Sequence, residues 1–558
     1  MSSVVRIRAL FLLFFLFIGT LPSFAQQRGV GAVASDNELA TKAGMEILQR
    51  GGNAMDAAVA TGFALAVVDP ASSGVGGGGF MVIYQINEKQ AHALDFRETA
   101  PAAAHRELYI KGGKPVPSLS LTGALAVAVP GEVAGLAEAH KRFGSLPLQT
   151  VMAPAIRYAV EGFPVRSYLR ATIERQLPNM RKFPDLAKVF LIGDGVPGEG
   201  ERIRQAELGE SLKAIAGEGP QVFYEGWIGQ TIAERIKKEG GVLTLEDLKN
   251  YRPVWREPLI GRYRKRLMIT MPPPSSGGIA LIEMLNMLEG YQLNVFPHNS
   301  ATYLHLVAEA MKHAFSDRAQ YLGDPDFVQV PTQKLASKEY AAWIRGRTSS
   351  ARTHPPSFYG LASFKGEKGG TTHFSVIDRA GNAVSCSLTI NTQFGSKVLV
   401  PGTGVILNNE MDDFSIQPGA PNVYKLVGDE ANSIQPKKRP LSSMAPTIIL
   451  QGERPVLIVG ASGGPRIISA TLQTIVNVLD FRIPLKKTIA APRIHHQWVP
   501  NEITVERGIP EVTRRSLGRR GHAVREGRSL GVVQAIVAQR QKLVGEADPR
   551  KEERSGSE

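Results

Sequence analysis

The feature that most constrains this chain is the run from Gly369 to Asp378, Gly-Gly-Thr-Thr-His-Phe-Ser-Val-Ile-Asp. Two glycines lead into a threonine and then into an alternating segment, the pattern of a half-buried strand. If the peptide bond before Thr371 is cut, the new α-amine lies a few bonds from the threonine hydroxyl and can act as its general base. An unperturbed α-amine has a pKa of about 7.7 to 8.0, so it accepts a proton near neutral pH. The run therefore predicts a threonine that becomes a catalytic N-terminus.

The chain can make this cut by itself. The Thr371 hydroxyl can attack the carbonyl of Gly370, and glycines at 369 and 370 tolerate the unusual backbone that such an attack requires. We therefore expect cleavage between Gly370 and Thr371. It would give a large chain, residues 26–370, and a small chain, residues 371–558, which carries the nucleophile.

The residues after Thr371 predict a hairpin that places a second threonine opposite the first. Two alternating segments are joined by Arg379-Ala380-Gly381, and a three-residue hairpin loop favours a residue with positive φ, here Gly381, in its last position. This register puts Thr371 opposite Thr389, with Asn391 further along the same face. Thr389 and Asn391 are therefore candidate site residues. A Thr-rich hairpin is also an ordinary β-former, and the pattern alone leaves both interpretations open.

Four further segments favour the catalytic interpretation. Together with Thr371-Thr372-His373 they resemble the γ-glutamyltransferase (γ-glutamyltranspeptidase) family of the N-terminal nucleophile hydrolases, in that family's order from about Val30 to Arg550. The resemblance implies an α+β fold, a four-layer αββα sandwich formed by both chains of a self-cleaved precursor. The four segments are Asp95-Phe96-Arg97-Glu98-Thr99-Ala100-Pro101, Leu407-Asn408-Asn409-Glu410-Met411-Asp412-Asp413-Phe414, Arg439-Pro440-Leu441-Ser442-Ser443-Met444-Ala445-Pro446-Thr447 and Gly460-Ala461-Ser462-Gly463-Gly464.

The resemblance also implies a site for the head of a glutamyl group. Arg97, with Ser442 and Ser443, would bind the α-carboxylate, a task that suits a planar guanidinium. Glu410 and Asp413 would hold the α-amino group. Without the resemblance, a lone loop arginine is usually structural, and serine pairs and closely spaced acids usually form turns.

Two further elements of the implied site would act on the reaction or on access to the pocket, rather than bind the glutamyl head. The backbone amides of Gly463 and Gly464 would form an oxyanion hole, where the lack of side chains permits close approach. The segment from Gln417 to Arg439 matches the lid of bacterial family members, with Tyr424 as its gate. Thr389 would hold the new amine or hydroxyl, and Asn391 would contact the substrate.

A serine esterase is the sharpest rival. A strand, the pattern Gly-x-Ser-x-Gly around Ser462, and a helix form a nucleophile elbow, and Asp480 with His495 or His496 could complete a triad. This hypothesis gives Thr371 no task, and the strand–helix alternation expected upstream of Ser462 is missing. We therefore favour the threonine.

Two patterns argue against other classes of site. The glycine run from Gly74 to Gly79 resembles a phosphate loop but lacks the Lys-Ser/Thr ending, so it indicates close backbone packing beside the site rather than nucleotide binding. The single cysteine, Cys386, excludes an intrachain disulfide and a multi-cysteine metal site. Because it falls within an alternating strand, we expect a packed thiol.

Residues 1–25 predict a secretory signal peptide. Arg6 and Arg8 precede an apolar run that is too short to favour a membrane span, and Ser23-Phe24-Ala25 has small residues at the cleavage-site positions. An uncleaved anchor is the alternative. We expect a periplasmic or extracellular protein without stable membrane association.

Composition describes an ordinary globular protein, with 43% hydrophobic and 21% charged residues. The net charge of +14 could suggest nucleic acid, but Lys and Arg are scattered among acids without a basic and aromatic pattern. We therefore expect no nucleic-acid partner, and the resemblance implies neither a metal nor an organic cofactor.

The implied function is that of a γ-glutamyltransferase and glutathione hydrolase. It would cleave glutathione and related γ-glutamyl donors and transfer the acyl group to water, amino acids or dipeptides, as a heterodimer of the two chains. A glutaryl-cephalosporin acylase and a poly-γ-glutamate transpeptidase are close alternatives. The full set of binders for a free glutamyl head argues against both.

Overall fold

The computed structural model describes residues 29–360, 370–417, 422–426, 428–539 and 542–553. The expected signal peptide, residues 1–25, lies outside the described residues. So does part of the expected lid, whereas its gate Tyr424 is described.

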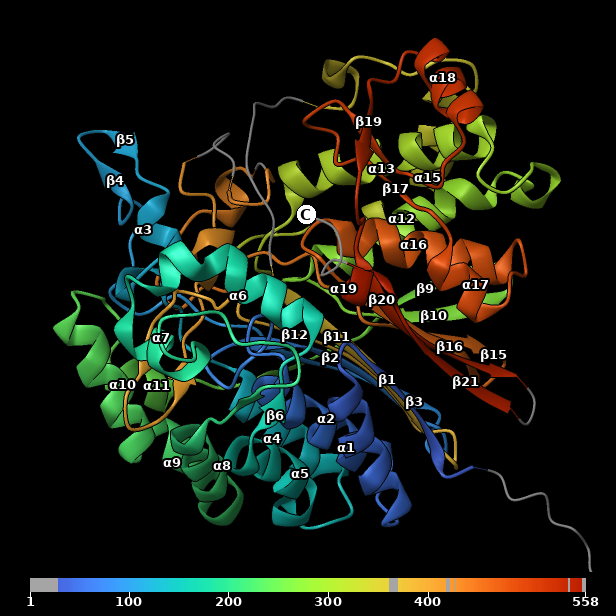
Figure 1. Cartoon of the computed structure of the whole chain (residues 1–558). Helices are drawn as coiled ribbons and strands as arrows, with labels where there is room; N and C mark the ends of the chain where they lie inside the picture. Colours follow the sequence, from blue (N-terminus) through green and yellow to red (C-terminus); the bar gives the residue numbers. More distant parts are fainter. Residues whose placement is uncertain (1–28, 361–369, 418–421, 427, 540–541, 554–558) are drawn as a thin grey trace, which may run out of the picture.

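Two six-stranded sheets form the centre of the molecule (Figure 1). The first has the strand order β1-β11-β12-β2-β3-β8, and the second has the order β21-β20-β16-β15-β10-β9. Both are built from antiparallel pairs. In the order above, the strands span Gly31–Ser35, Thr371–Asp378, Ala383–Thr389, Gly78–Gln85, Gln90–Phe96 and Val254–Arg256, then Lys542–Ala547, Val532–Gln539, Arg454–Ser462, Thr447–Gln451, Arg266–Thr270 and Leu259–Tyr263.

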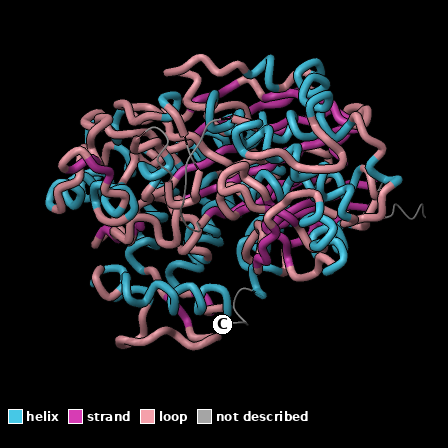
Figure 2. Tube along the Cα trace, turned by 90° about the horizontal axis from the view of Figure 1, so that it is seen from above, coloured by secondary structure: helices cyan, strands magenta, loops and turns pink. Residues whose placement is uncertain are grey.

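Helices cover the outer face of each sheet. On the first sheet, α2 (Ala54–Val68) packs against β11 and β12, and α1 (Glu38–Gln49) packs against β1. On the second, α16 (Arg466–Leu479) packs on β16 and β20, and α12 (Ser276–Glu289) packs on β9, with α13 (Ala301–Tyr321) behind it. Figure 2 shows the strands in the middle of the molecule with helices around them. The four-layer αββα sandwich is therefore confirmed.

Further helices extend the two outer layers and complete the fold. The first-sheet side carries a largely helical region from α4 to α11, and the C-terminal part of the chain closes the second side (Figure 1). The longer of these helices are α4 (Glu132–Phe143), α5 (Leu148–Glu161), α6 (Ser167–Met180), α7 (Pro184–Phe190), α8 (Ala206–Glu218), α10 (Trp227–Lys238), α15 (Lys338–Arg347) and α18 (Glu511–Arg519).

Local sequence signals fix several of these elements. Asn53 follows the Gly51-Gly52 pair, caps α2 and forms a capping box with Asp56. Ser300 caps α13, because its hydroxyl accepts from the N–H of Tyr303. Helix α15 begins after its cap Ser337 and ends at Arg347.

The hairpin has the predicted register. Thr371 lies opposite Thr389, and Gly381 closes the loop with a φ of +105°. Phe374 and Cys386 point into the core under α2, so the thiol is packed as expected. Their neighbours at odd-numbered positions of β11 face the second sheet, where Ser375 Oγ donates to the carbonyl of Gln534. Thr371 is therefore at the end of a strand, between the two sheets.

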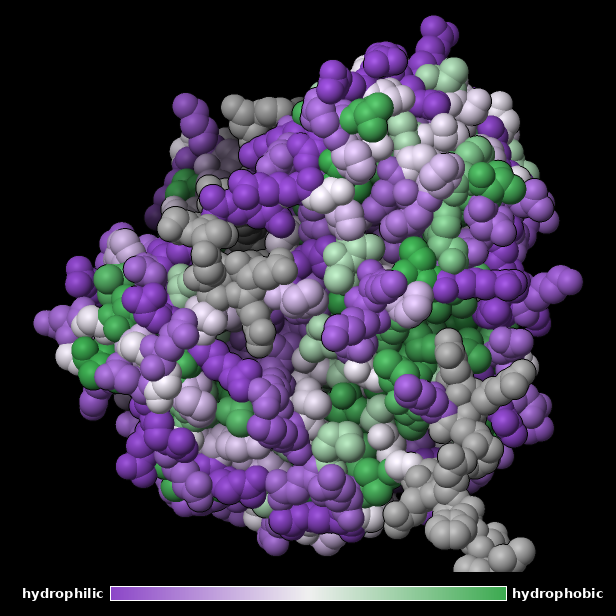
Figure 3. Space-filling view, turned by 45° about the vertical axis from the view of Figure 1, so that its right-hand side comes forward, coloured by the Kyte–Doolittle hydropathy of each residue, from purple (hydrophilic) through white to green (hydrophobic). Residues whose placement is uncertain are grey.

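The surface is mixed in character. Figure 3 shows mostly hydrophilic side chains on the face that it presents, with a hydrophobic area to the right of its centre. Among the described residues, none of the helices combines the length and apolar character needed to cross a lipid bilayer.

Candidate active site

One cavity collects nearly all of the predicted site residues. It lies where β11 and β12 end and is walled by the loops that follow β3, β14 (Val405–Ile406) and β16. Among the predicted residues, only Gly370 and Gly463 are not in its lining, and each is the neighbour of a residue that is. The lining consists of Arg97, Thr371, Thr389, Asn391, Glu410, Asp413, Tyr424, Ser442, Ser443 and Gly464, with Leu426, Met444 and Ile467 as apolar members.

The two threonines and the glycine carbonyl form a chain of contacts at the predicted cleavage point. Thr389 Oγ1 donates to the carbonyl oxygen of Gly370 at 3.1 Å and lies 3.4 Å from Thr371 Oγ1. The backbone N–H of Asn391 donates to Thr389 Oγ1 at 2.8 Å and so orients that hydroxyl. Thr389 can therefore polarise the carbonyl that Thr371 would attack.

The glycine run packs against this end of the hairpin, as expected. A Cβ on Gly77 would overlap the carbonyl oxygen of Thr389, and one on Gly79 would overlap that of Ser387. Only glycine permits β2 and the loop before it to approach β12 so closely. The run thus acts through backbone packing beside the site.

Arg97 is fully buried and holds the acids that face it. Its Nη1 donates to Glu410, and its Nη2 donates to Asp413 Oδ2 at 2.5 Å. Its Nε donates to the carbonyl of Pro440 at 3.2 Å. Burial alone would lower the pKa of Arg97, but the carboxylates of Glu410 and Asp413 outweigh it and raise that pKa. Arg97 therefore pairs with both acids inside the cavity, and its single positive charge compensates part of their combined negative charge.

Three buried polar atoms in the cavity have no hydrogen-bond partner among the described residues: Asn391 Oδ1, Glu410 Oε2 and Ser443 Oγ. Buried polar groups are normally paired, so a cluster of unpaired ones in a cavity indicates a binding site for a polar ligand. A carbonyl oxygen and a carboxylate oxygen accept hydrogen bonds from an ammonium group, and a hydroxyl donates to a carboxylate. The unpaired atoms suit the two charged groups of an α-amino acid.

The two predicted oxyanion-hole glycines have backbone conformations that other residues rarely adopt. The φ angles of Gly463 and Gly464 are +124° and +61°. A Cβ on Gly464 would lie 2.6 Å from the ring of Tyr424. Tyr424 is buried, and its hydroxyl donates to the carbonyl of Asn391 at 2.6 Å. The tyrosine therefore closes the cavity over Gly464.

Two charged residues of the site were missed in the sequence. Glu98 is fully buried, with Oε2 3.6 Å from Arg97 Nη1, and burial raises its pKa to about 7. Its position directly after Arg97 was the available signal. Arg318 on α13 lies in a second cavity that shares Asp413 with the first. The sequence signal for Arg318 was its position seven residues after Met311, which puts an arginine on the apolar face of a helix.

The rival triad is not assembled. Asp480 accepts hydrogen bonds from Tyr263 and from Arg264. His495 Nδ1 contacts Ser469 Oγ at 2.5 Å. Within the described residues, no hydrogen bond joins Ser462 to any of these groups.

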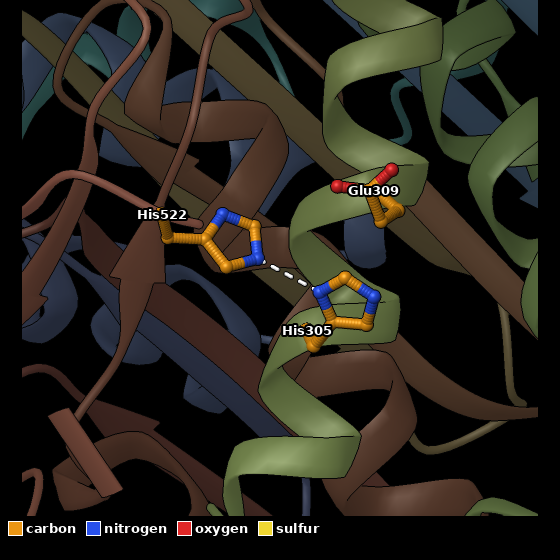
Figure 4. A group of neighbouring side chains, drawn as sticks. All are labelled: His305, Glu309 and His522. Atoms are coloured by element: carbon orange, nitrogen blue, oxygen red, sulfur yellow. Dashed lines mark hydrogen bonds between the residues drawn. The ribbon is translucent and has the colours of Figure 1, made fainter. Parts of the chain in front are cut away.

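A buried cluster of His305, Glu309 and His522 has ligand atoms within 4.8 Å of one another (Figure 4). His305 Nε2 donates to the carbonyl of Ser349 at 2.8 Å, which leaves His305 Nδ1 to accept from His522 Nε2 at 2.8 Å. Glu309 accepts from the hydroxyl of Thr353 at 2.6 Å. These bonds occupy the atoms that a metal would need, so the cluster ties α13 to neighbouring loops.

Comparisons with known proteins agree with this geometry. The family described as Gamma-glutamyltranspeptidase matches residues 40–557. The chain is 43% identical to the glutathione hydrolase proenzyme of Escherichia coli over 93% of this chain and 90% of that protein.

Solved structures show the same fold. The chain superposes on a cephalosporin acylase from Bacillus halodurans with a TM-score of 0.82 and 30% identity, covering 96% of this chain and 98% of that one. A Helicobacter pylori gamma-glutamyltranspeptidase chain gives a TM-score of 0.57 and 39% identity, over 60% of this chain and 98% of that one. With the sequence match, these findings establish that the protein belongs to the γ-glutamyltranspeptidase family.

Proposed function

We propose that this protein is a γ-glutamyltransferase and glutathione hydrolase that uses Thr371 as its nucleophile. The observation that carries the proposal is the cavity itself. An arginine, two acids and a serine pair lie beside a threonine pair at the end of a central strand, and Asn391, Glu410 and Ser443 each have a buried polar atom without a partner among the described residues. Such a cavity suits a free amino-acid head, and the γ-carbonyl of the donor would then lie near the nucleophile.

Maturation is the first step of the proposed mechanism. Thr371 Oγ1 attacks the carbonyl carbon of Gly370, and the proton of the hydroxyl passes to the departing amine of Thr371. Thr389 supports this step, because its hydroxyl already donates to the carbonyl oxygen under attack. Water then hydrolyses the ester, giving chains 26–370 and 371–558 with a free amine on Thr371.

Turnover uses the same hydroxyl. The α-amine of Thr371 takes the hydroxyl proton, Oγ1 attacks the γ-carbonyl of the donor, and the amides of Gly463 and Gly464 receive the negative charge on oxygen. The protonated amine of Thr371 gives this proton to the departing nitrogen as the C–N bond breaks, and loss of cysteinylglycine or another amine leaves a γ-glutamyl ester on Oγ1. Water, an amino acid or a dipeptide then attacks the ester and frees the threonine. No metal or organic cofactor takes part.

Binding of the donor requires an exchange of ionic partners. The α-carboxylate takes Arg97 with Ser442 and Ser443, while the ammonium takes Glu410 and Asp413. Each charged group of the substrate thus replaces one side of the ion pairs that Arg97 forms with these acids.

Because a cephalosporin acylase is among the structural neighbours, a glutaryl compound is the second candidate donor. A glutaryl group lacks the α-amine, so Glu410 and Asp413 would have no partner in it. We therefore place the glutaryl acylase second, and a poly-γ-glutamate transpeptidase third because its donor lacks a free head. Comparing kcat/KM for γ-glutamyl-p-nitroanilide and glutaryl-p-nitroanilide separates the first two, and a preference for the glutaryl compound would reverse the order.

The location follows from the signal peptide expected at residues 1–25. We propose a heterodimer that is secreted across the inner membrane and works in the periplasm or outside the cell, on small-molecule substrates.

The assignment is tested by denaturing electrophoresis and N-terminal sequencing. The wild-type protein should give two bands, the smaller beginning at Thr371, and should turn over γ-glutamyl-p-nitroanilide. Thr371→Ala should remain one chain without activity. Thr372→Ala is the matched control, since its side chain contacts Asp36 instead of the cleavage point, and it should still be cut. An uncut wild-type chain with full activity would overturn the proposal.

A further inference from the structure

Arg318 is a buried cation beside the donor site that lacks an ionic partner. It lies on α13 with 5% of its surface exposed. Its Nε donates to Ser276 Oγ at 3.0 Å. Among the described residues, no carboxylate forms an ion pair with it, whereas Arg97 contacts three acids. A guanidinium is costly to bury without compensation, so its position calls for a reason.

Arg318 and Asp413 line the same small cavity. The cavity also contains Ser415, whose buried hydroxyl has no partner among the described residues, together with Asn422 and Asn432. Asp413 lines both this cavity and the donor cavity. Asp413 thus pairs with Arg97 in the donor cavity and shares the second cavity with Arg318.

Electrostatics support this arrangement. Burial lowers the pKa of Arg318 to about 10, an effect that Asp413 opposes and Arg97 reinforces. The side chain remains charged at neutral pH, and both groups act on it from the donor site. Asp413 is held on its other oxygen, where Asn422 Nδ2 donates to Oδ1 at 3.1 Å.

A second connection leads from Arg318 to the carboxylate end of the site. Ser276, which accepts from Arg318, donates through its hydroxyl to the carbonyl of Ser442 at 2.6 Å and through its backbone N–H at 2.8 Å. The loop that carries Ser442 and Ser443 is therefore fixed by the same arginine.

Donor binding explains why a second arginine is needed. The donor's carboxylate draws Arg97 away from Asp413, and the donor's ammonium then needs Asp413 ionised and in place. In the described part of the chain, Arg318 is the cation that still faces Asp413 after this exchange.

We propose that Arg318 is a positioning residue that holds Asp413 and the Ser442 loop for recognition of a free α-amino acid head. This inference rests on the proposed function and adds a specificity determinant to it. Arg318 itself does not touch the reacting atoms. It acts through Asp413 on the ammonium and through Ser276 on the carboxylate.

Steady-state kinetics of Arg318→Met test the proposal. For γ-glutamyl-p-nitroanilide we expect KM to rise about 10-fold or more with kcat within about 3-fold, because ground-state and transition-state binding are lost together. For glutaryl-p-nitroanilide, which lacks the ammonium, the rise in KM should be clearly smaller. Equal losses for both donors, or an unchanged KM, would overturn the inference.

Controls separate positioning from general stability. Lys312→Met removes another buried cation from the same helix, one that faces Glu309, and should leave KM for both donors unchanged. Arg318→Lys keeps a charge and should regain part of the donor selectivity. Arg318→Lys also takes the place of the methionine variant if Arg318→Met is not cleaved. A lysine variant whose KM rises as much as we expect for Arg318→Met would contradict the proposal.

Added guanidinium provides a further readout. In Arg318→Ala the lost side chain enlarges the cavity beside Asp413, so millimolar guanidinium should lower KM for the γ-glutamyl donor, and no rescue would count against the inference. If wild type itself fails to turn over γ-glutamyl donors, the proposed function fails. If wild type is active and Arg318→Met is normal, only this inference fails.

Discussion

At the scale of single residues, the charged groups of the proposed donor site pair with one another. Arg97 contacts Glu410 and Asp413, the two acids that we propose for binding a donor's ammonium. A ligand with only one charge would break these pairs and leave a buried charge unpaired, which is costly. A zwitterionic head replaces both partners at once. Selectivity for an α-amino acid thus follows from internal ion pairing, as well as from direct contacts.

The acid side of the pH profile should depend on Glu410. Burial raises its pKa, the carboxylates of Glu98 and Asp413 raise it further, and Arg97 opposes them. Glu410 attracts the ammonium with a full negative charge only when it is ionised, so KM for γ-glutamyl-p-nitroanilide should increase as the pH falls through this raised pKa. The apparent pKa belongs to the coupled acids rather than to Glu410 alone.

Glu410→Gln removes this titration but keeps one accepting oxygen. We expect KM at pH 8 to rise about 3- to 10-fold, since one charge-assisted contact becomes neutral, and its increase at acid pH to become shallower. Glu453→Gln, at an exposed carboxylate, is the control. An unchanged acid limb in Glu410→Gln would assign the titration to Glu98 or another group.

Gly464 should tolerate no side chain while Tyr424 covers it. A Cβ there would lie 2.6 Å from the tyrosine ring, on a backbone with a φ of +61°. Gly464→Ala should lower kcat about 100-fold if the oxyanion hole is displaced. Adding Tyr424→Ala to Gly464→Ala removes the overlap and should restore part of kcat. If the fold-losses in kcat of the two single variants multiply in the double variant, the two residues do not interact.

At the scale of elements, the hairpin was predictable because local rules determine it. A loop ending in glycine and a period of two fix the register that pairs Thr371 with Thr389. The capped helix α2 was predictable for the same reason. Arg318 was not, because a helical stripe tells which side chains are buried but not which distant loop, here the one carrying Asp413, packs opposite. The site residues themselves came from the family resemblance more than from spacing.

One carboxylate joins the hairpin to helix α2. Asp378 Oδ1 accepts from the N–H groups of Gly381 and Asn382 at 2.9 and 3.0 Å. Its Oδ2 accepts from the N–H of Ala54, the first residue of α2, at 3.0 Å. It therefore fixes the loop that sets the register and caps a helix that packs on the nucleophile strand.

Asp378→Ala should lower the free energy of unfolding by about 3 kcal/mol, because several charge-assisted hydrogen bonds are lost at a buried site. The urea midpoint measures this loss, and the fraction of chain cut at Thr371 should fall as well. Asp194→Ala, at an exposed loop position, is the control. A full yield of cut chain with unchanged stability would contradict the role of Asp378 in the register.

At the scale of the whole molecule, cleavage should not separate the two chains. In the first sheet, β11 and β12 of the small chain lie between β1 and β2 of the large chain, and the second sheet also combines strands from both. Each chain therefore completes the sheets of the other. The N-terminus that the proposed cleavage would form lies in a central strand, where its position depends on neighbouring strands from both sides of the cleavage point.

The C-terminal helix α19 (Arg550–Glu553) adds an ionic link between the chains. Lys551 is buried and its Nζ contacts Asp69 Oδ2 at 2.5 Å and Asp36 Oδ2 at 3.2 Å, both from the large chain. Asp36 also accepts from the hydroxyl of Thr372 at 3.0 Å, next to the nucleophile. The lysine thus compensates two acids that would otherwise repel each other at the entry to β11.

Lys551→Met should weaken the association of the cut chains by about 3 to 5 kcal/mol, because two buried carboxylates lose their cation. Burial raises the pKa of Asp69 to about 6, with Lys551 opposing and Asp36 adding to the rise. An acid with a raised pKa costs stability once it ionises, so the defect should be larger at pH 8 than at pH 5. Gel filtration in moderate urea measures the dissociation.

Lys542→Met, on an exposed side chain, should behave as wild type, and Asp69→Asn added to Lys551→Met should recover part of the loss. Equal dissociation at both pH values would show that Asp36 and Asp69 are not the groups that Lys551 compensates.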